Sequence, residues 1–199
     1  TASAVFSLLI DTGVPGSPVL SVTQAITNDN KPVIGGTAEA GSTVSIYRGN
    51  TQLGQVAASS GGVISFIPTT ALPDGTYVLT ATASDFAGNI SAASNPITLV
   101  VDTVVPSVPT LTGTSPSSTS TPVISGVAEA NATVTILNGN TSLGQASADA
   151  GGNYTFTPGS PLGDGTHLLS ATASDAAGNT GTASAVFSLL IDTGVPGSP

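Results

Sequence analysis

Residues 74–89 read DGTYVLTATASDFAGN, and residues 164–179 read DGTHLLSATASDAAGN, so one stretch occurs twice with few changes. In the first copy the side chains at every second position are apolar, and we expect this set to face a core: Tyr77, Leu79, Ala81 and Ala83. A period of two is typical of a β-strand with one buried face. Turn-forming residues lie at both ends of the stretch, Asp-Gly at its start and Ala-Gly-Asn at its end. The stretch therefore predicts a long strand of an all-β domain.

Longer repeats surround this stretch. Residues 1–18 recur letter for letter as residues 182–199. The motif Asp-Thr-x-x-Pro occurs three times, beginning at Asp11, Asp102 and Asp192. A period of about 90 residues suits a small domain that closes its own core, not a solenoid unit that only stacks. We therefore predict two tandem domains between flanking pieces of further repeats, divided as 1–10 (a strand of an upstream repeat), 11–101, 102–191 and 192–199 (the start of the next repeat).

The composition supports an all-β fold and excludes several classes of function. The chain has no Cys, Met or Trp, and only 4% of its residues are aromatic. Two basic residues, Lys31 and Arg48, stand against eleven acidic ones, which gives a net charge of −9. Such a chain cannot neutralise nucleic-acid phosphates, and anionic membrane surfaces are disfavoured for the same reason. No apolar run reaches the length of a membrane span, so we expect no membrane insertion.

The spacing of turn residues predicts about seven strands per repeat, as in a β-sandwich. In the first repeat the predicted strands cover residues 19–25, 32–38, 43–48, 52–57, 63–67, 76–84 and 96–101. Phe66 and its counterpart Phe156 are the expected large core residues. No stretch sustains a helical period for three turns.

Five motifs together cover nearly the whole chain: D-T-x-x-P, G-x-A-E-A-x-x-T-V, L-G-Q, L-x-D-G-T and A-T-A-S-D-x-A-G-N. This combination resembles the bacterial Ig-like tandem repeats of giant surface adhesins, including biofilm-associated proteins secreted by type I systems. The resemblance implies two immunoglobulin-like β-sandwiches in an extracellular protein, secreted or on a bacterial cell surface. It also implies long rods whose partners are neighbouring repeats of the same chain, and calcium at the module junctions.

The acidic residues of each repeat are expected to gather at one pole. In an Ig-like sandwich the loops that follow strands B and F lie at the pole where strand A begins. This places two sets of carboxylates together, Asp11, Glu39 and Asp85 in the first repeat and Asp102, Glu129 and Asp175 in the second. Calcium, which takes six to eight oxygens, would relieve their repulsion. The alternative stays open that Asp85 and Asp175 only cap their turns while both glutamates are solvated.

Three further positions have structural interpretations. Asp74 and Asp164 lie at the opposite pole in Asp-Gly-Thr sequences, which turn chemistry explains. Tyr77 is predicted to hydrogen-bond the corner before its strand, in the manner of an Ig tyrosine corner. His167 takes the same place in the second repeat, and we expect a structural role for it and no catalytic one.

The sequence predicts a structural spacer and no enzyme. A single histidine cannot support a repeated catalytic triad, and eight aromatic residues expected mostly in the core leave little to hold a sugar. The prediction is a calcium-rigidified rod that supports cell adhesion or biofilm formation. Two alternatives are a direct glycan- or protein-binding module and an accessory module of a secreted polysaccharide-degrading enzyme. Residues 1–10 form an unpaired apolar strand in this scheme, which would favour strand-mediated self-association.

Overall fold

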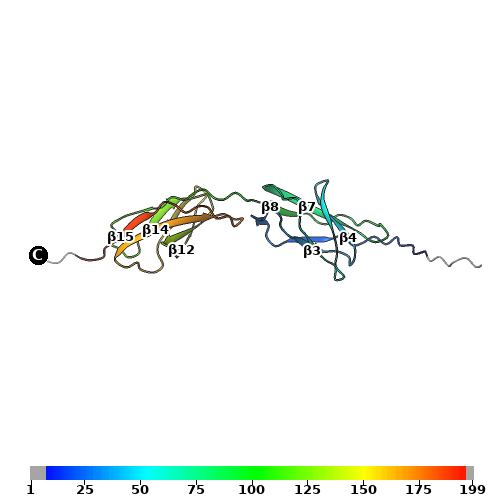
Figure 1. The fold of residues 1–199 in the computed structure, drawn as a ribbon, viewed down its shortest axis with the longest axis horizontal. Coiled ribbons are helices and arrows are strands. Elements are labelled where there is room, and N and C mark those ends of the chain that lie inside the picture. The colour runs from blue at the N-terminus through cyan, green and yellow to red at the C-terminus, as the bar shows by residue number, and fades with distance from the viewer. Residues whose placement is uncertain (1–7, 196–199) are drawn as a thin grey trace, which may run out of the picture. The chain divides into compact units, whose positions relative to one another are not determined.

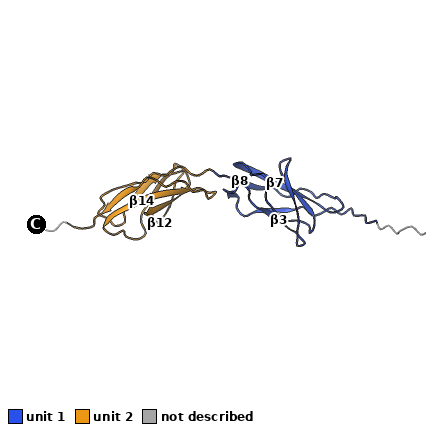
Figure 2. Cartoon of the chain, in the orientation of Figure 1, with its two compact units in different colours: residues 1–103 blue, residues 104–199 orange. Residues whose placement is uncertain are grey.

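The computed structural model of the chain describes residues 8–195, which form strands and loops but no helix. The all-β fold predicted from the sequence is therefore confirmed. The described residues contain no helix that is long and apolar enough to cross a membrane. Contacts divide the chain into two compact units, Thr1–Thr103 and Val104–Pro199 (Figure 2). This division falls two residues after the predicted boundary at 101/102, and Thr103 is hydrogen-bonded to Asp74 of the first unit.

Unit 1 is a sandwich of two sheets (Figure 1). One sheet has the order β1-β3-β6 and the other the order β2-β8-β7-β4-β5. The strand bounds are β1 (Val19–Val22), β2 (Ile26–Thr27), β3 (Ile34–Thr37), β4 (Thr43–Arg48), β5 (Thr51–Ala57), β6 (Val63–Phe66), β7 (Gly75–Ser84) and β8 (Ile97–Val101).

The core of unit 1 lies between the sheets, and every second side chain of β7 contributes to it. Its four predicted inward side chains, Tyr77, Leu79, Ala81 and Ala83, are all buried. Leu79 is fully buried, and burying a leucine contributes roughly 1.5–3 kcal/mol to folding. Phe66 is also buried, as predicted.

The first predicted strand ends earlier than expected, and a second short strand follows it in the other sheet. We expected one strand over 19–25, whereas β1 pairs with β3 in one sheet and β2 pairs in parallel with β8 in the other. The main-chain bond from Val100 N to Ala25 O begins the second pairing. The switch covers the free edge of β8, which would otherwise present unpaired main-chain groups.

Unit 2 repeats the arrangement with two sheets, β13-β10-β9 and β12-β11-β14-β15 (Figure 1). An isolated parallel bridge between Ser117 and Ile191 takes the place of the β2–β8 pairing. The core again includes the buried Phe156. The strand bounds are β9 (Thr112–Gly113), β10 (Ile124–Val127), β11 (Thr133–Asn138), β12 (Thr141–Ser147), β13 (Asn153–Phe156), β14 (Gly165–Ser174) and β15 (Phe187–Ile191).

The glycine of the L-G-Q motif is required by the aromatic ring that lies over it. A Cβ atom on Gly54 would come within 2.6 Å of Cε2 of Phe66. In unit 2 a Cβ on Gly144 would come within 2.8 Å of the same atom of Phe156. The motif and the core phenylalanine are thus two sides of one contact, repeated in both units.

Candidate functional site at the two ends of each unit

The C-terminal end of each unit is held by an aspartate of the corner before β7 or β14. Oδ1 of Asp74 accepts hydrogen bonds from the amide of Thr103 at 3.0 Å and from its hydroxyl at 2.9 Å. Asp164 and Thr193 repeat this pair with distances of 3.0 and 2.8 Å. We call the aspartate–threonine pair of each unit the C-terminal clamp.

The C-terminal clamp also affects ionisation. The hydroxyl and amide of Thr193 stabilise the charged form of Asp164 and hold the pKa of that carboxyl below its ordinary value. Main-chain bonds support the same segment, from Asp102 N to Thr27 O and from Asp192 N to Ser117 O, each at 2.9 Å.

The sequence interpretation of Asp74 and Asp164 as plain turn residues was therefore incomplete. The missed signal was the recurrence of Asp-Gly-Thr with Asp-Thr-x-x-Pro at a fixed separation.

The N-terminal end of unit 1 is held by the loop that follows β7. Asp85 accepts the amide of Asn89 at 2.9 Å on Oδ1 and the Asn89 side-chain nitrogen at 2.8 Å on Oδ2. The same Nδ2 donates to the main-chain oxygen of Asp11 at 3.1 Å. We call Asp85, Asn89 and Asp11 the N-terminal clamp. The Asn89 side chain and amide lower the pKa of Asp85.

Unit 2 repeats the loop part of this arrangement. Asp175 accepts the amide of Asn179 at 2.9 Å and its side-chain nitrogen at 2.8 Å. Asn179 is buried, whereas Asn89 is half-buried. Both aspartates thus accept hydrogen bonds from their own loops, as in the alternative interpretation that Asp85 and Asp175 cap their turns.

The predicted calcium ligands fit this geometry only in part. Glu39 is exposed, and Oδ1 of Asp11 accepts the amide of Gly13 at 2.9 Å. Within either unit, the described residues bring no three Asp, Glu or His side chains close enough together to hold a metal ion. An ion at this pole would take most of its oxygens from the main chain or water. Asp102 belongs to unit 1 while Glu129 and Asp175 belong to unit 2, and calcium at this junction stays a prediction.

The corner before β7 contains the tyrosine hydrogen bond that the sequence predicts. The hydroxyl of Tyr77 donates to the main-chain oxygen of Pro73. In unit 2 the Nε2 atom of His167 lies 2.8 Å from the equivalent oxygen, that of Gly163. The residue that contacts this side chain from the neighbouring strand also differs between the units. In unit 1 it is Arg48, whose guanidinium lies 4.8 Å from the centre of the Tyr77 ring. Asn138 instead places its Nδ2 atom 2.9 Å from Nδ1 of His167, so both ring nitrogens have structural partners.

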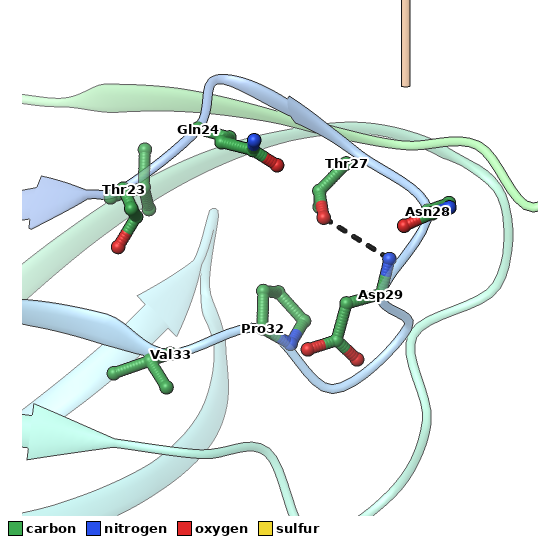
Figure 3. A pocket seen from close by; sticks show the side chains of 8 residues that line it. Thr23, Gln24, Thr27, Asn28, Asp29, Pro32 and Val33 are labelled. Carbon is green, nitrogen blue, oxygen red and sulfur yellow. Dashed lines mark hydrogen bonds between the residues drawn. The ribbon is translucent and has the colours of Figure 1, made fainter. Parts of the chain in front are cut away.

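A small hollow lies beside the ends of β1 and β2 in unit 1 (Figure 3). Its volume is about 290 Å³, at the lower limit of the roughly 300–1,000 Å³ of typical ligand pockets. Its one carboxylate, Asp29, accepts the amide of Lys31, and the Asp29 amide donates to Thr27. The lining residues are Val22, Thr23, Gln24, Thr27, Asn28, Asp29, Pro32 and Val33. The side chains of Thr27 and Asp29 thus accept hydrogen bonds from the main chain of their own loop.

One aromatic residue departs from the expectation that the aromatics belong to the core. Phe86, in the loop between Asp85 and Asn89, is fully exposed. It lies two residues after the end of β7, where the chain turns and the side chain has no sheet to cover it. Phe66, Tyr77, Tyr154 and Phe156 are buried as expected. The counterpart of Phe86 in unit 2 is Ala176.

The duplicated end sequence has two environments. Leu189 and Ile191 in β15 are buried, with exposures of 1% and 0%. The same letters at Leu8 and Ile10 are 70% and 76% exposed. Residues 1–7 lie outside the described part of the chain, so the predicted strand remnant is described only in part.

The sequence profile of the bacterial Ig-like domain family matches residues 10–103 and 112–193. The chain therefore belongs to the bacterial Ig-like domain family, with one domain in each unit. No curated protein matches the chain.

Three solved structures match the chain over most of its length. A tetra-tandem repeat from the extending region of a large adhesion protein is 18% identical over 90% of this chain, with a TM-score of 0.38. The BSP domain of a biofilm-associated protein is 22% identical over 92%, with a TM-score of 0.35. The human OSCAR ligand-binding domain is 16% identical over 88% of this chain and 99% of its own length, with a TM-score of 0.41. The chain spans 50% and 30% of the first two structures.

Proposed function

We propose that the chain is a non-catalytic spacer segment of a bacterial surface adhesin, supporting cell adhesion or biofilm formation. The supporting observation is that the C-terminal clamp occurs in both units with nearly identical distances. A clamp that holds the chain where it leaves a domain restricts the direction in which the connecting segment can run. The junction also contains Pro106, which limits main-chain freedom.

The spacer function is tested by the width of the distance distribution between the two units. We expect a narrow distribution for the native chain and a broader one when Asp74→Ala removes the C-terminal clamp. Equal widths for the two proteins would contradict the proposed role of the clamp.

We also propose that calcium binds near Asp102, Glu129 and Asp175 and adds stiffness to the junction. The net charge of −9 with only two basic residues supports this, since bound cations reduce repulsion between carboxylates. In this proposal Asp102 and Asp175 would supply carboxylate oxygens, and main-chain oxygens would complete the site. Calorimetric titration of calcium into the apo protein tests binding directly.

A second candidate function, direct binding of a ligand, is favoured by the exposed Phe86. An exposed aromatic ring at a loop apex is a common anchor for a protein or glycan partner. The discriminating experiment is adhesion of the full-length parent protein with Phe86→Ala. A spacer keeps its adhesion in this variant, whereas a direct binder loses it.

A further inference from the structure

We propose that Asn131 is the acceptor of an N-linked sugar. Residues 129–133 read Glu-Ala-Asn-Ala-Thr, and Asn-x-Thr is the acceptor sequence for glycosylation of asparagine. The proposal goes beyond the spacer function and does not depend on it.

The acceptor sequence lies at the apex of a tight turn. The amide of Ala132 donates to the main-chain oxygen of Glu129 at 3.1 Å, which closes a four-residue turn. Asn131 is the third residue of this turn and has a φ of 63°, as a type II turn requires. The side chains of Asn131 and Thr133 are both exposed. The two groups that a transferase must recognise are therefore accessible.

The fold uses the backbone of Asn131 but not its carboxamide. Its amide donates to the main-chain oxygen of Asp149 at 3.3 Å, while its side chain makes no hydrogen bond to the part of the chain that the structure describes. Unit 1 builds the same turn with Gly41, where φ is 76° and Ser42 N donates to Glu39 O at 3.1 Å. Glycine adopts positive φ at least cost. The turn therefore does not require an asparagine side chain.

Three other Asn-x-Ser/Thr sequences are less suited to modification. The carboxamide of Asn89 is bonded within the N-terminal clamp, and the Ser91 that follows it is buried. Asn153 lies in β13, and its Nδ2 approaches Asp149 at 3.4 and 3.5 Å. Asn140 is exposed, but both residues after it, Thr141 and Ser142, lie in β12. At Asn131 only the second residue after it lies in a strand, because Thr133 is the first residue of β11.

The chemistry is a glycosyl transfer from a sugar carried on a phosphate leaving group. Nδ2 of Asn131 forms a bond to the anomeric carbon as the bond from that carbon to the phosphate oxygen breaks. The phosphate leaves with the electron pair, and Nδ2 loses one proton to a base of the transferase. Glu129, two residues before the acceptor, offers a carboxylate that a basic group of the transferase can pair with.

The test is mass spectrometry of the parent protein purified from the bacterium that makes it. Cleavage after acidic residues releases residues 130–149, which contain both Asn131 and Asn140, and fragmentation assigns the sugar. We expect an added sugar mass on Asn131, its complete loss in Asn131→Gly and Thr133→Ala, and its retention in Thr133→Ser. Asn131→Gly keeps the turn, as Gly41 shows, so loss of the sugar is not loss of the fold.

A gain-of-site variant provides the matched control. Gly41→Asn places an asparagine at positive φ two residues before Thr43, behind Glu39, and we expect a second sugar in unit 1. Unmodified Asn131 in the native protein would overturn the proposal. A sugar found on Asn140 or on a serine or threonine, and still present in Asn131→Gly, would overturn it as well.

Discussion

Asp74 and Thr103 lie 29 residues apart in the chain, and one carboxylate oxygen of Asp74 accepts both the amide and the hydroxyl of Thr103. Asp164 and Thr193 form the same pair with the same separation. Two motifs that look independent in the sequence, L-x-D-G-T and D-T-x-x-P, are therefore two halves of one contact. The junction motif begins inside the domain that precedes it.

Removing the threonine hydroxyl should loosen the start of the junction. In Thr103→Val the amide still reaches Asp74, but the bond from Oγ1 at 2.9 Å is lost. We expect faster backbone motion at residues 103–105, measured by ¹⁵N relaxation, with little change in the core of unit 1. Thr103→Ser keeps the hydroxyl and should behave as the native chain. Identical relaxation in the valine and serine variants would contradict the role of the hydroxyl.

Acid should open the C-terminal clamp of unit 2. The pKa of Asp164 is lowered by the bonds from Thr193, so the folded state holds its proton less tightly than the unfolded chain does. The stabilisation is therefore fully present above the unfolded value of about 3.9. It is lost as the pH falls through the lower folded value. Carboxyl ¹³C shifts should show Asp164 titrating below an unstructured aspartate, and the melting curve of Asp164→Asn should lose that part of its acid dependence.

The glycine beneath the core phenylalanine should not accept a side chain. Gly54→Ala places a Cβ within 2.6 Å of the Phe66 ring, and such overpacking typically costs about 1–3 kcal/mol of unfolding free energy. Denaturant unfolding measures this cost. Gly61→Ala is the control, because the nearest atom to its Cβ is the Ser59 hydroxyl at 3.9 Å. Gly54→Ala with Phe66→Leu should recover part of the loss, since the smaller side chain leaves space.

Identical letters in two environments give a matched pair of substitutions. Leu8→Asp alters the exposed copy and Leu189→Asp the buried copy of the same sequence. If the apolar N-terminal segment mediates self-association, the sedimentation coefficient of the native protein should rise with protein concentration. Leu8→Asp should reduce this rise while the melting temperature stays constant. Leu189→Asp should unfold unit 2, because truncating a buried leucine already costs about 2–5 kcal/mol. Native protein that stays monomeric at high concentration would exclude the association.

Calcium should raise the melting temperature if it binds at the junction. At a calcium concentration ten times Kd, one site contributes about 1.4 kcal/mol. Thermal unfolding in calcium and in EDTA measures the difference, and Asp102→Asn should reduce it. Magnesium at equal ionic strength controls for simple screening of charge. Superimposable curves in calcium and EDTA would contradict calcium binding.

The core was predictable from the sequence because the period of two is a local signal. The inward face of β7 and the burial of Phe66 follow from single strands without knowledge of their partners. The Tyr77 corner was predictable for a similar reason, since its acceptor Pro73 lies only four residues away.

The clamps and the separate strand β2 were not predictable in this way. The bond from Asn89 to Asp11 joins residues 78 positions apart, and no local pattern records it. The switch of β2 to the second sheet depends on the free edge of β8. Residue type alone predicted that most aromatic side chains lie in the core, whereas the place of Phe86 in a turn leaves it exposed.

The distance between spin labels in the two units tests the central claim most directly. The chain has no cysteine, so Gln52→Cys with Ser142→Cys places one label at the same repeat position of each unit. Pulsed electron resonance in EDTA should give one narrow distance distribution, which broadens when Asp74→Ala is added. A distribution that is already broad in the otherwise native chain, and unchanged by Asp74→Ala, would contradict the claim that the clamp fixes the path of the junction.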